Sequence, residues 1–354
     1  MKLADLVEEY RSGLEAKYGH RLLSAHKRAM SDILRCRTPA AGEMIVRCPD
    51  CNRLVYLCHS CGHRSCPACQ NHETGAWLDR QREKLLPVPY FLVTFTVPSS
   101  LRPLAWRNQR RFYSFLFEAA AATLRAFGSD ERFLGGNIGM TGVLHTNSRR
   151  LDFHPHVHFL IPAGAIDLKQ RSWKRKDWNF LFPQEALAKV FREKIVCHIR
   201  DEGWQLPDGL RVRNWVVSCK NAGTGEPALK YLSRYLYRGI ISEKQIIDNR
   251  DGMVSFRYRE SRTGIWKTRT LPGEDFLWLV FQHVLPRGFR RVRDFGFLHG
   301  NARKSLRLIQ LLLFAKVPLR KQRPRPVFHC PVCGAGMAII AVRVQATALP
   351  CGPP

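Results

Sequence analysis

The stretch HPHVHFLI, residues 154–161, places three histidines at alternate positions immediately before an apolar run. On a β-strand, side chains two residues apart point to the same face. His156 and His158 are therefore expected to face together, while Val157 turns into the core. Two imidazoles on one rigid strand make a preformed pair of ligands for a divalent metal ion. His154 would share that face and is a possible third ligand. The stretch thus predicts a metal site carried by a strand.

The segments around this strand alternate between helical and strand patterns, which predicts an α+β fold. The nearest partner strand is residues 139–145, joined to residues 154–161 by a polar turn. The other expected strands are residues 90–97 (a buried run rich in β-branched and aromatic residues), 212–218, 253–259 and 266–271. The expected helices are two over residues 3–34, with a break near Gly19, and one each over residues 77–86, 112–127, 184–201, 226–238 and 276–285.

Changes of composition along the chain divide it into three expected regions. Residues 1–86 combine helices with a cysteine-rich block and are expected to form a zinc-binding, DNA-contacting module. Residues 87–285 hold the predicted sheet and its flanking helices. Residues 286–354 are basic and contain a last C-x-x-C pair, Cys330 and Cys333, which is half a zinc site with no second pair nearby in the sequence.

Three C-x-x-C pairs occur within 22 residues: Cys48/Cys51, Cys58/Cys61 and Cys66/Cys69. Each pair can present two thiolates from a tight turn, as tetrahedral zinc requires. We favour Cys48, Cys51, Cys66 and Cys69 as the first site, with Cys58 and Cys61 as alternative ligands. Further candidates for one or two zinc ions are Cys36, His59, His63 and His72. A four-ligand site leaves no open position for a substrate, so the expected zinc is structural.

Two tyrosines lie four residues apart on the predicted helix over residues 226–238. Tyr231 and Tyr235 share one helix face, whereas Tyr237 points elsewhere. Taken alone, such a pair is ordinarily core packing. Beside a metal-binding histidine strand it suggests nucleophilic catalysis.

The histidine strand and the tyrosine helix together suit chemistry on a phosphodiester. A phenol is a weak nucleophile because its pKa is about 10. A divalent ion such as Mn or Mg at the histidines would polarise the phosphate, and imidazole ligands suit Mn better than Mg. The tyrosine would then retain the cut strand covalently, which conserves the bond energy for rejoining.

The net charge of +28, from 57 Lys and Arg against 29 Asp and Glu, indicates a polyanionic partner, nucleic acid before membrane. No apolar run is long enough to span a bilayer, and the N-terminus lacks the apolar core of a signal peptide. We therefore expect a cytoplasmic protein with reduced cysteines. The basic residues expected to contact DNA phosphates are Arg287, Arg290, Arg291, Arg293, Arg303, Lys304 and Arg307.

These motifs resemble the rolling-circle HUH transposases of bacterial insertion sequences, in the two-tyrosine group typified by insertion sequence ninety-one. The resemblance rests on RCPDC…SCPAC, LPVPYFLVTFTVP, HPHVHFLIPAGA, ALKYLSRYLYRGIIS and HVLPRGFRRVRDFGFLHG, which extend over most of the chain.

By this resemblance, His156 and His158 match the metal-binding pair, and Tyr231 and Tyr235 match the nucleophiles. The implied fold is a small antiparallel sheet with the histidines on a central strand and the tyrosines on a helix alongside. The implied activity cleaves single-stranded DNA at the element's ends, forms a 5′-phosphotyrosine and joins the strand to a target. Such a protein would be bacterial and nucleoid-associated.

Two other functions account for part of the sequence. A His-x-His metallohydrolase would use the metal site with both tyrosines merely packed, but no repeated βα pattern supplies its further ligands. A zinc-finger DNA-binding regulator without catalysis explains the charge and the cysteines, yet leaves the histidine strand unexplained. The oligomeric state and the DNA ends recognised are not indicated by the sequence.

Overall fold

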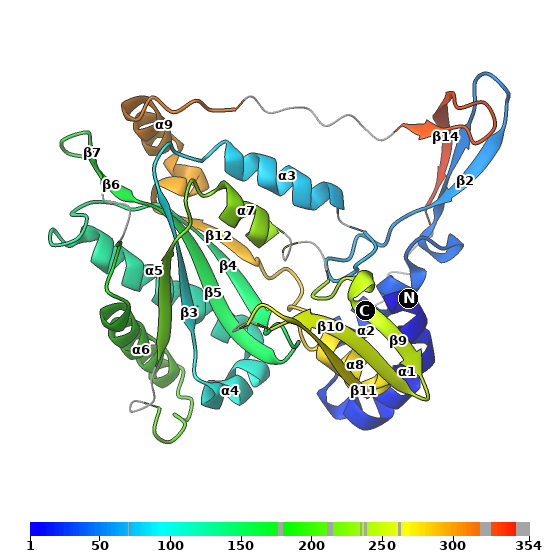
Figure 1. Cartoon of the computed structure of the whole chain (residues 1–354), viewed down its shortest axis with the longest axis horizontal. Coiled ribbons are helices and arrows are strands. Elements are labelled where there is room, and N and C mark those ends of the chain that lie inside the picture. The colour runs from blue at the N-terminus through cyan, green and yellow to red at the C-terminus, as the bar shows by residue number, and fades with distance from the viewer. Residues whose placement is uncertain are drawn as a thin grey trace, which may run out of the picture.

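The computed structural model describes residues 1–69, 71–175, 180–210, 215–233, 236, 239–260, 263–318 and 327–344. It confirms the predicted α+β class, with antiparallel sheets and flanking helices (Figure 1). Within these ranges, every helix is too short or too polar to traverse a bilayer.

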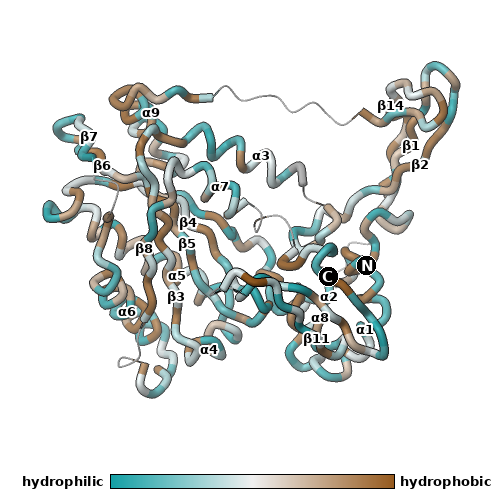
Figure 2. The backbone as a smooth tube through the Cα atoms, viewed as in Figure 1, coloured by the Kyte–Doolittle hydropathy of each residue, from teal (hydrophilic) through white to brown (hydrophobic). Residues whose placement is uncertain are grey.

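A five-stranded antiparallel sheet forms the centre of the molecule. Its strands, in spatial order, are β12 (Val292–Phe295), β4 (Met140–Asn147), β5 (Phe153–Pro162), β3 (Tyr90–Thr96) and β8 (Val216–Asn221). β5, which carries the histidine stretch, is therefore the central strand, and its predicted partner over residues 139–145 is confirmed as β4. In Figure 2, β3 is drawn largely in hydrophobic colours, as expected for a buried strand.

Helices cover both faces of this sheet. α4 (Arg102–Arg107), α5 (Gln109–Ser129) and α6 (Gln184–Asp201) lie over one face, where β5 contributes Val157 and Phe159. α3 (Asn71–Arg82), α7 (Glu226–Ser233) and α9 (Arg303–Leu312) lie over the other (Figure 1). Because side chains alternate along a strand, Val157 enters the first layer while its neighbours turn toward the second. The prediction that Val157 faces the core is confirmed.

A second core joins the N-terminus to a late part of the chain. α1 (Leu3–Tyr18) and α2 (Ser24–Arg35) pack against α8 (Gly273–Phe281) and a three-stranded sheet. The strands of that sheet are β9 (Ile246–Arg250), β10 (Met253–Arg259) and β11 (Trp266–Pro272). A two-stranded ribbon, β6 (Gly164–Asp167) and β7 (Ser172–Arg175), extends from the end of β5.

The cysteine-rich block forms an arm that includes the end of the described chain. β1 (Glu43–Arg47) pairs with β2 (Leu54–Cys58) and also with β14 (Gly336–Arg343). The short β13 (Phe328–His329) pairs with the other side of β14. Figure 1 shows β14 in the same arm as β2, at the opposite end of the molecule from α9; β1 lies between the two strands in the sheet.

These packings cross the three regions expected from the sequence. The second core joins residues before 86 to α8, and β14 completes the N-terminal arm, while β12 belongs to the central sheet. Local composition does not show such pairings, because they join residues far apart in the chain. The expected helix over residues 226–238 is confirmed as far as Ser233, and Tyr235 and Tyr237 lie outside the described residues.

Candidate metal, tyrosine and zinc sites

Three histidines converge on the face of the sheet covered by α7. His156 and His158 come from β5, and His145 comes from β4, where it pairs directly with His156. One nitrogen of each ring lies within 4.8 Å of the others. The ring centroids are 4.5 Å apart for His145 and His158 and 4.9 Å apart for His156 and His158. This is the arrangement of a three-imidazole metal site.

Hydrogen bonds fix which nitrogen of each β5 histidine can bind a metal. The Nδ1 atom of His156 lies 2.7 Å from the carbonyl oxygen of His154, which can only accept, so Nδ1 carries the proton and Nε2 the lone pair. The Nδ1 atom of His158 lies 2.7 Å from the Thr94 hydroxyl, and its buried Nε2 has no partner among the described residues. Both Nε2 atoms are thus oriented as ligands by neighbours on the other ring nitrogen.

Burial keeps the histidines neutral. It lowers the pKa of His156 to about 4 and that of His158 to about 3, and it holds the pKa of His145 well below its usual value. A neutral imidazole offers its lone pair without competition from a proton. The donor set therefore fits a divalent transition metal at neutral pH.

His145 takes the position for which His154 was the sequence candidate. His154 accepts a 2.9 Å hydrogen bond at Nδ1 from Arg102, and it does not belong to the three-histidine cluster. The structure brings together His156 and His158 as expected and replaces His154 with His145. The sequence contained a signal for His145 in the predicted hairpin, because pairing residues 139–145 with the histidine strand places a histidine opposite His156. Thr94 was missed because its position beside His158 depends on the pairing of β3 with β5.

Tyr231 faces this cluster from α7. Its ring centroid is 6.4 Å from those of both His145 and His158, and the side chain is half-buried. α7 begins after a Gly-rich loop, and its buried residues Leu229 and Leu232 pack against the sheet. That packing turns the Tyr231 ring toward the histidines.

The cysteines form two clusters of four. One contains Cys36, Cys61, Cys66 and Cys69, and the other Cys48, Cys51, Cys330 and Cys333. Sulfur–sulfur distances are 3.6 Å for Cys36 and Cys66 and 3.8 Å for Cys61 and Cys69. In the second cluster they range from 3.4 to 3.8 Å. Four thiolates at about 2.3 Å from zinc lie about 3.8 Å from one another, so both clusters fit a tetrahedral zinc ion.

This grouping corrects the quartet favoured from the sequence. Cys48 and Cys51 lie with the C-terminal pair, while Cys66 and Cys69 lie with Cys61 and with Cys36 from the end of α2. The half site at Cys330 thus finds its partner pair through the pairing of β14 with β1. Cys58 belongs to neither cluster. Backbone N–H groups of Cys333 and Val332 lower the pKa of Cys330 to about 6, which favours the thiolate that zinc binds.

Comparison with known proteins identifies the family to which the chain belongs. A family model described as "Transposase zinc-binding domain" matches residues 6–97, and one described as "Putative transposase" matches residues 139–305. The chain is 32% identical to the "Putative transposase y4qJ" of Sinorhizobium fredii, over 96% of this chain and 94% of that protein. It is also 32% identical to the transposase for insertion sequence element IS801 of Pseudomonas savastanoi pv. phaseolicola, over 88% and 82% of the two chains. The chain belongs to the IS91 family of transposases.

In this transposase the first cysteine cluster lies wholly inside the matched zinc-binding domain, whereas Cys330 and Cys333 lie beyond both matched ranges. The match over residues 139–305 includes the three histidines, Tyr231 and α7. The zinc-binding domain and the two clusters support structural zinc.

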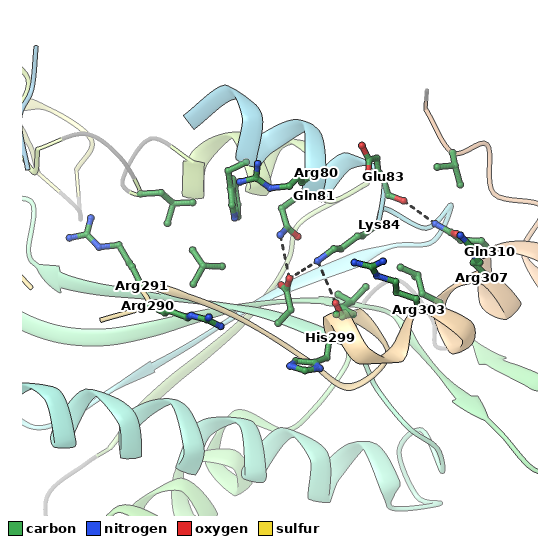
Figure 3. Close-up of a pocket in the computed structure, with 18 of the residues that line it drawn as sticks. Arg80, Gln81, Glu83, Lys84, Arg290, Arg291, His299, Arg303, Arg307 and Gln310 are labelled. Atoms are coloured by element: carbon green, nitrogen blue, oxygen red, sulfur yellow. Dashed lines mark hydrogen bonds and ion pairs between the residues drawn. The ribbon is translucent and has the colours of Figure 1, made fainter. Parts of the chain in front are cut away.

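A transposase acts on DNA, and a basic cavity of about 890 Å³ lies between α3, β12 and α9 (Figure 3). Its cationic side chains are Arg64, Arg80, Lys84, Arg290, Arg291, Arg303 and Arg307. Lys84 is paired with Asp294 at 2.5 Å. Four others form no ion pair with any residue in the described ranges: Arg80, Arg290, Arg303 and Arg307. Such a surface attracts phosphates.

Only part of the basic set expected from the sequence lines this cavity. Arg290, Arg291, Arg303 and Arg307 do so, and α3 adds Arg80 and Lys84, which sequence reasoning missed. Arg293 instead lies over the rings of Phe117 and Phe289 and donates to Ser114, so its side chain packs within the fold. Lys304 does not line the cavity, and Arg287 lines a different one.

We expect charge reversal in this cavity to weaken DNA binding for all sequences alike. The double substitution Arg303→Glu, Arg307→Glu removes two potential phosphate contacts from exposed positions. The slope of log Kd against log salt should therefore fall by about two. Fluorescence anisotropy with a labelled oligonucleotide at several salt concentrations measures it. Lys304→Glu on the same helix is the matched control, and equal slopes for the double variant and the wild type would argue against the cavity as a phosphate site.

Proposed function

We propose that this transposase cleaves and rejoins single-stranded DNA at the ends of its insertion sequence through a 5′-phosphotyrosine, with Tyr231 as a nucleophile. The observation that carries the proposal is the position of the Tyr231 ring, 6.4 Å from two members of the His145, His156, His158 cluster. The Tyr231 ring packs against the core that contains Leu229 and Leu232, and it also lies beside the buried, neutral imidazoles of His145 and His158. A phenol in this position could attack a phosphate whose charge a divalent ion at the histidines would neutralise.

The three histidines would hold a divalent ion, Mn or Mg, with imidazole favouring Mn. That ion would supply neutralisation of the charge that develops on the scissile phosphate. The protein's own part is orientation: Thr94 and the His154 carbonyl fix the His158 and His156 rings, and α7 directs Tyr231 toward them. Rigid placement of the nucleophile lowers the entropic part of the barrier.

The proposed reaction is a transesterification. The Tyr231 phenolic oxygen, after losing its proton, forms a bond to phosphorus, and the bond from phosphorus to the 3′ oxygen breaks. That oxygen takes up a proton and leaves as a free 3′-OH. Attack by another 3′-OH on the phosphotyrosine reverses these steps and joins the new strand. No oxidant, nucleotide or water is consumed, and the second tyrosine, Tyr235, allows a second transfer.

The proposal is tested by incubating the full-length protein with single-stranded oligonucleotides that carry the ends of the element, in Mn²⁺ or in chelator. After denaturation, we expect DNA to remain attached to the protein only when the metal is present. A hydrolase with packed tyrosines would release both products free, and a non-catalytic regulator would leave the oligonucleotide intact. Either result would overturn the proposal.

A substitution of Thr94 tests the metal site without removing a proposed metal ligand. Its hydroxyl, 2.7 Å from the His158 Nδ1, orients the ring. Thr94→Val keeps the shape but removes the hydroxyl, and we expect the metal affinity to fall about 10- to 100-fold. Thr94→Ser should retain most of it. A calorimetric titration with Mn²⁺ measures the metal affinity of both variants. Equal affinities for the valine and serine variants would count against a role of Thr94 in orienting His158.

A further inference from the structure

A second large cavity, of about 1410 Å³, opens beside the first residue of β5. Its walls come from α2, from α4 with the start of α5, and from the segment that follows α8. Arg287 lines this cavity and belongs to neither the basic cavity of Figure 3 nor the histidine cluster. None of the proposed catalytic residues lines it. It is therefore a distinct part of the surface.

The lining of this cavity is suited to an anionic ligand rich in hydrogen-bond acceptors. Its charged members are arginines, and no carboxylate occurs among the described residues that line it. Two buried donors on the lining have no partner in the described part of the chain, the Nε2 atom of Gln109 and the Nε atom of Arg102. Gln109 is only 5% exposed. A buried donor without an acceptor costs free energy, which a bound acceptor would recover.

Flat side chains make up a second component of the wall. Trp106 and Phe153 meet edge to face with centroids 5.3 Å apart, and the guanidinium of Arg21 lies 6.0 Å from the centre of the Trp106 ring. Aromatic rings and guanidinium planes are the surfaces on which unpaired nucleobases stack. The basic cavity, by contrast, carries the carboxylates of Glu83 and Asp294 beside its cationic side chains.

A chain of hydrogen bonds joins this cavity to the candidate active site. Arg102 donates to His154 Nδ1 at 2.9 Å, and the carbonyl oxygen of His154 accepts from His156 at 2.7 Å. Phe153 precedes His156 by three residues, a span of about 10 Å on a strand. Phe153 packs on the α4–α5 face of the sheet and His156 lies on the α7 face, so a DNA strand that joins the two would pass around the start of β5, a path of several nucleotides at about 3.4 Å per nucleotide.

We propose that this cavity binds an unpaired nucleobase of the DNA strand within a few nucleotides of the cleavage point. The Trp106 ring stacks on the base, Phe153 and Arg21 complete the wall around it, Gln109 donates to the edge of the base, and the neighbouring arginines hold the adjoining phosphates. The inference rests on the proposed function, because it takes a single strand as the substrate. It adds base recognition by a defined pocket to the phosphate contacts expected at the basic cavity.

The test measures equilibrium binding of labelled hexanucleotides of dT, dA or dC, and of a hexamer of abasic sugar-phosphate, to the full chain. The wild type should bind the best of the three base-containing hexamers at least about fivefold more tightly than the abasic one, because stacking contributes that much per base. Trp106→Ala should bring this ratio close to one. Trp266→Ala, a substitution of a tryptophan that is 57% exposed on β11, is the matched control and should leave it unchanged.

Gln109→Met retains the volume of the side chain and provides a second variant if Trp106→Ala does not fold by circular dichroism. It should reduce the differences in Kd among dT, dA and dC by about fivefold, with abasic binding unchanged. Equal binding of base-containing and abasic hexamers by the wild type would overturn the proposal, as would base dependence unaltered in both variants. Binding needs no cleavage, so this result is independent of whether a covalent adduct forms.

Discussion

Replacing Tyr231 and Tyr235 together with Phe is expected to reduce the covalent protein–DNA adduct by at least about a thousandfold, because it removes both attacking oxygens and leaves the rings in place. The ring supplies nearly all the packing of the half-buried Tyr231 side chain against the cluster. The free energy of unfolding should therefore change little. A denaturing gel with a radiolabelled oligonucleotide measures the adduct, and urea unfolding measures the stability.

Tyr258→Phe on β10 is the control, since that tyrosine lies in the three-stranded sheet away from the histidines. Tyr235→Phe should block completion of strand transfer or the first cleavage, according to the order in which the two tyrosines act, and Tyr237→Phe should be tolerated. If the double variant preserves full adduct formation, both tyrosines are packing residues and the proposed chemistry fails.

Loss of either zinc ion is expected to unfold the part of the protein that the ion holds together. We expect two zinc ions per chain, one for each cysteine cluster. Structural zinc contributes on the order of 10–16 kcal/mol in small finger peptides, so its loss should unfold the segment it holds. Cys66→Ser should damage the core that Cys66 and Cys69 share with α1 and α8. Cys330→Ser should unfold only the arm of β1, β2 and β14, where Cys48 and Cys330 form a small separate core.

Metal analysis of the purified variants, with limited proteolysis, separates these outcomes. Cys66→Ser and Cys330→Ser should each retain one zinc ion, and of these two only the Cys330→Ser protein should keep the core of α1, α2 and α8 intact. Cys58→Ser is the matched control, because Cys58 lies in the same block but in neither cluster. A wild-type protein with one zinc ion, or a Cys58→Ser protein that loses one, would falsify the assignment of two four-cysteine sites.

The sequence was most informative where local pattern and geometry coincide. Alternation along residues 154–161 predicted the shared face of His156 and His158, and the expected hairpin with residues 139–145 is confirmed by β4 and β5. The helix over residues 184–201 is also confirmed. In each segment, the apolar residues recur with the period of the helix or strand and lie on its buried face, so the pattern alone predicts the element.

What the sequence could not predict depends on contacts between distant residues. The pairing of β14 with β1 brings Cys330 near Cys48, and no local spacing reveals it. His145 and Thr94 join the histidine site through strand register, which was set by the whole sheet. Arg293 shows the opposite case. A basic residue in a basic run was expected to face DNA, but its guanidinium packs on two aromatic rings.

The most direct test of the central claim is to identify the amino acid that carries the DNA. The full-length protein is reacted with a single-stranded element end in Mn²⁺, digested with protease and nuclease, and the modified peptide is sequenced by mass spectrometry. The account predicts a nucleotide bound through phosphate to Tyr231 or to Tyr235. A nucleotide on Tyr237 or on a serine, or cleavage in Mn²⁺ that leaves no modified peptide, would contradict it.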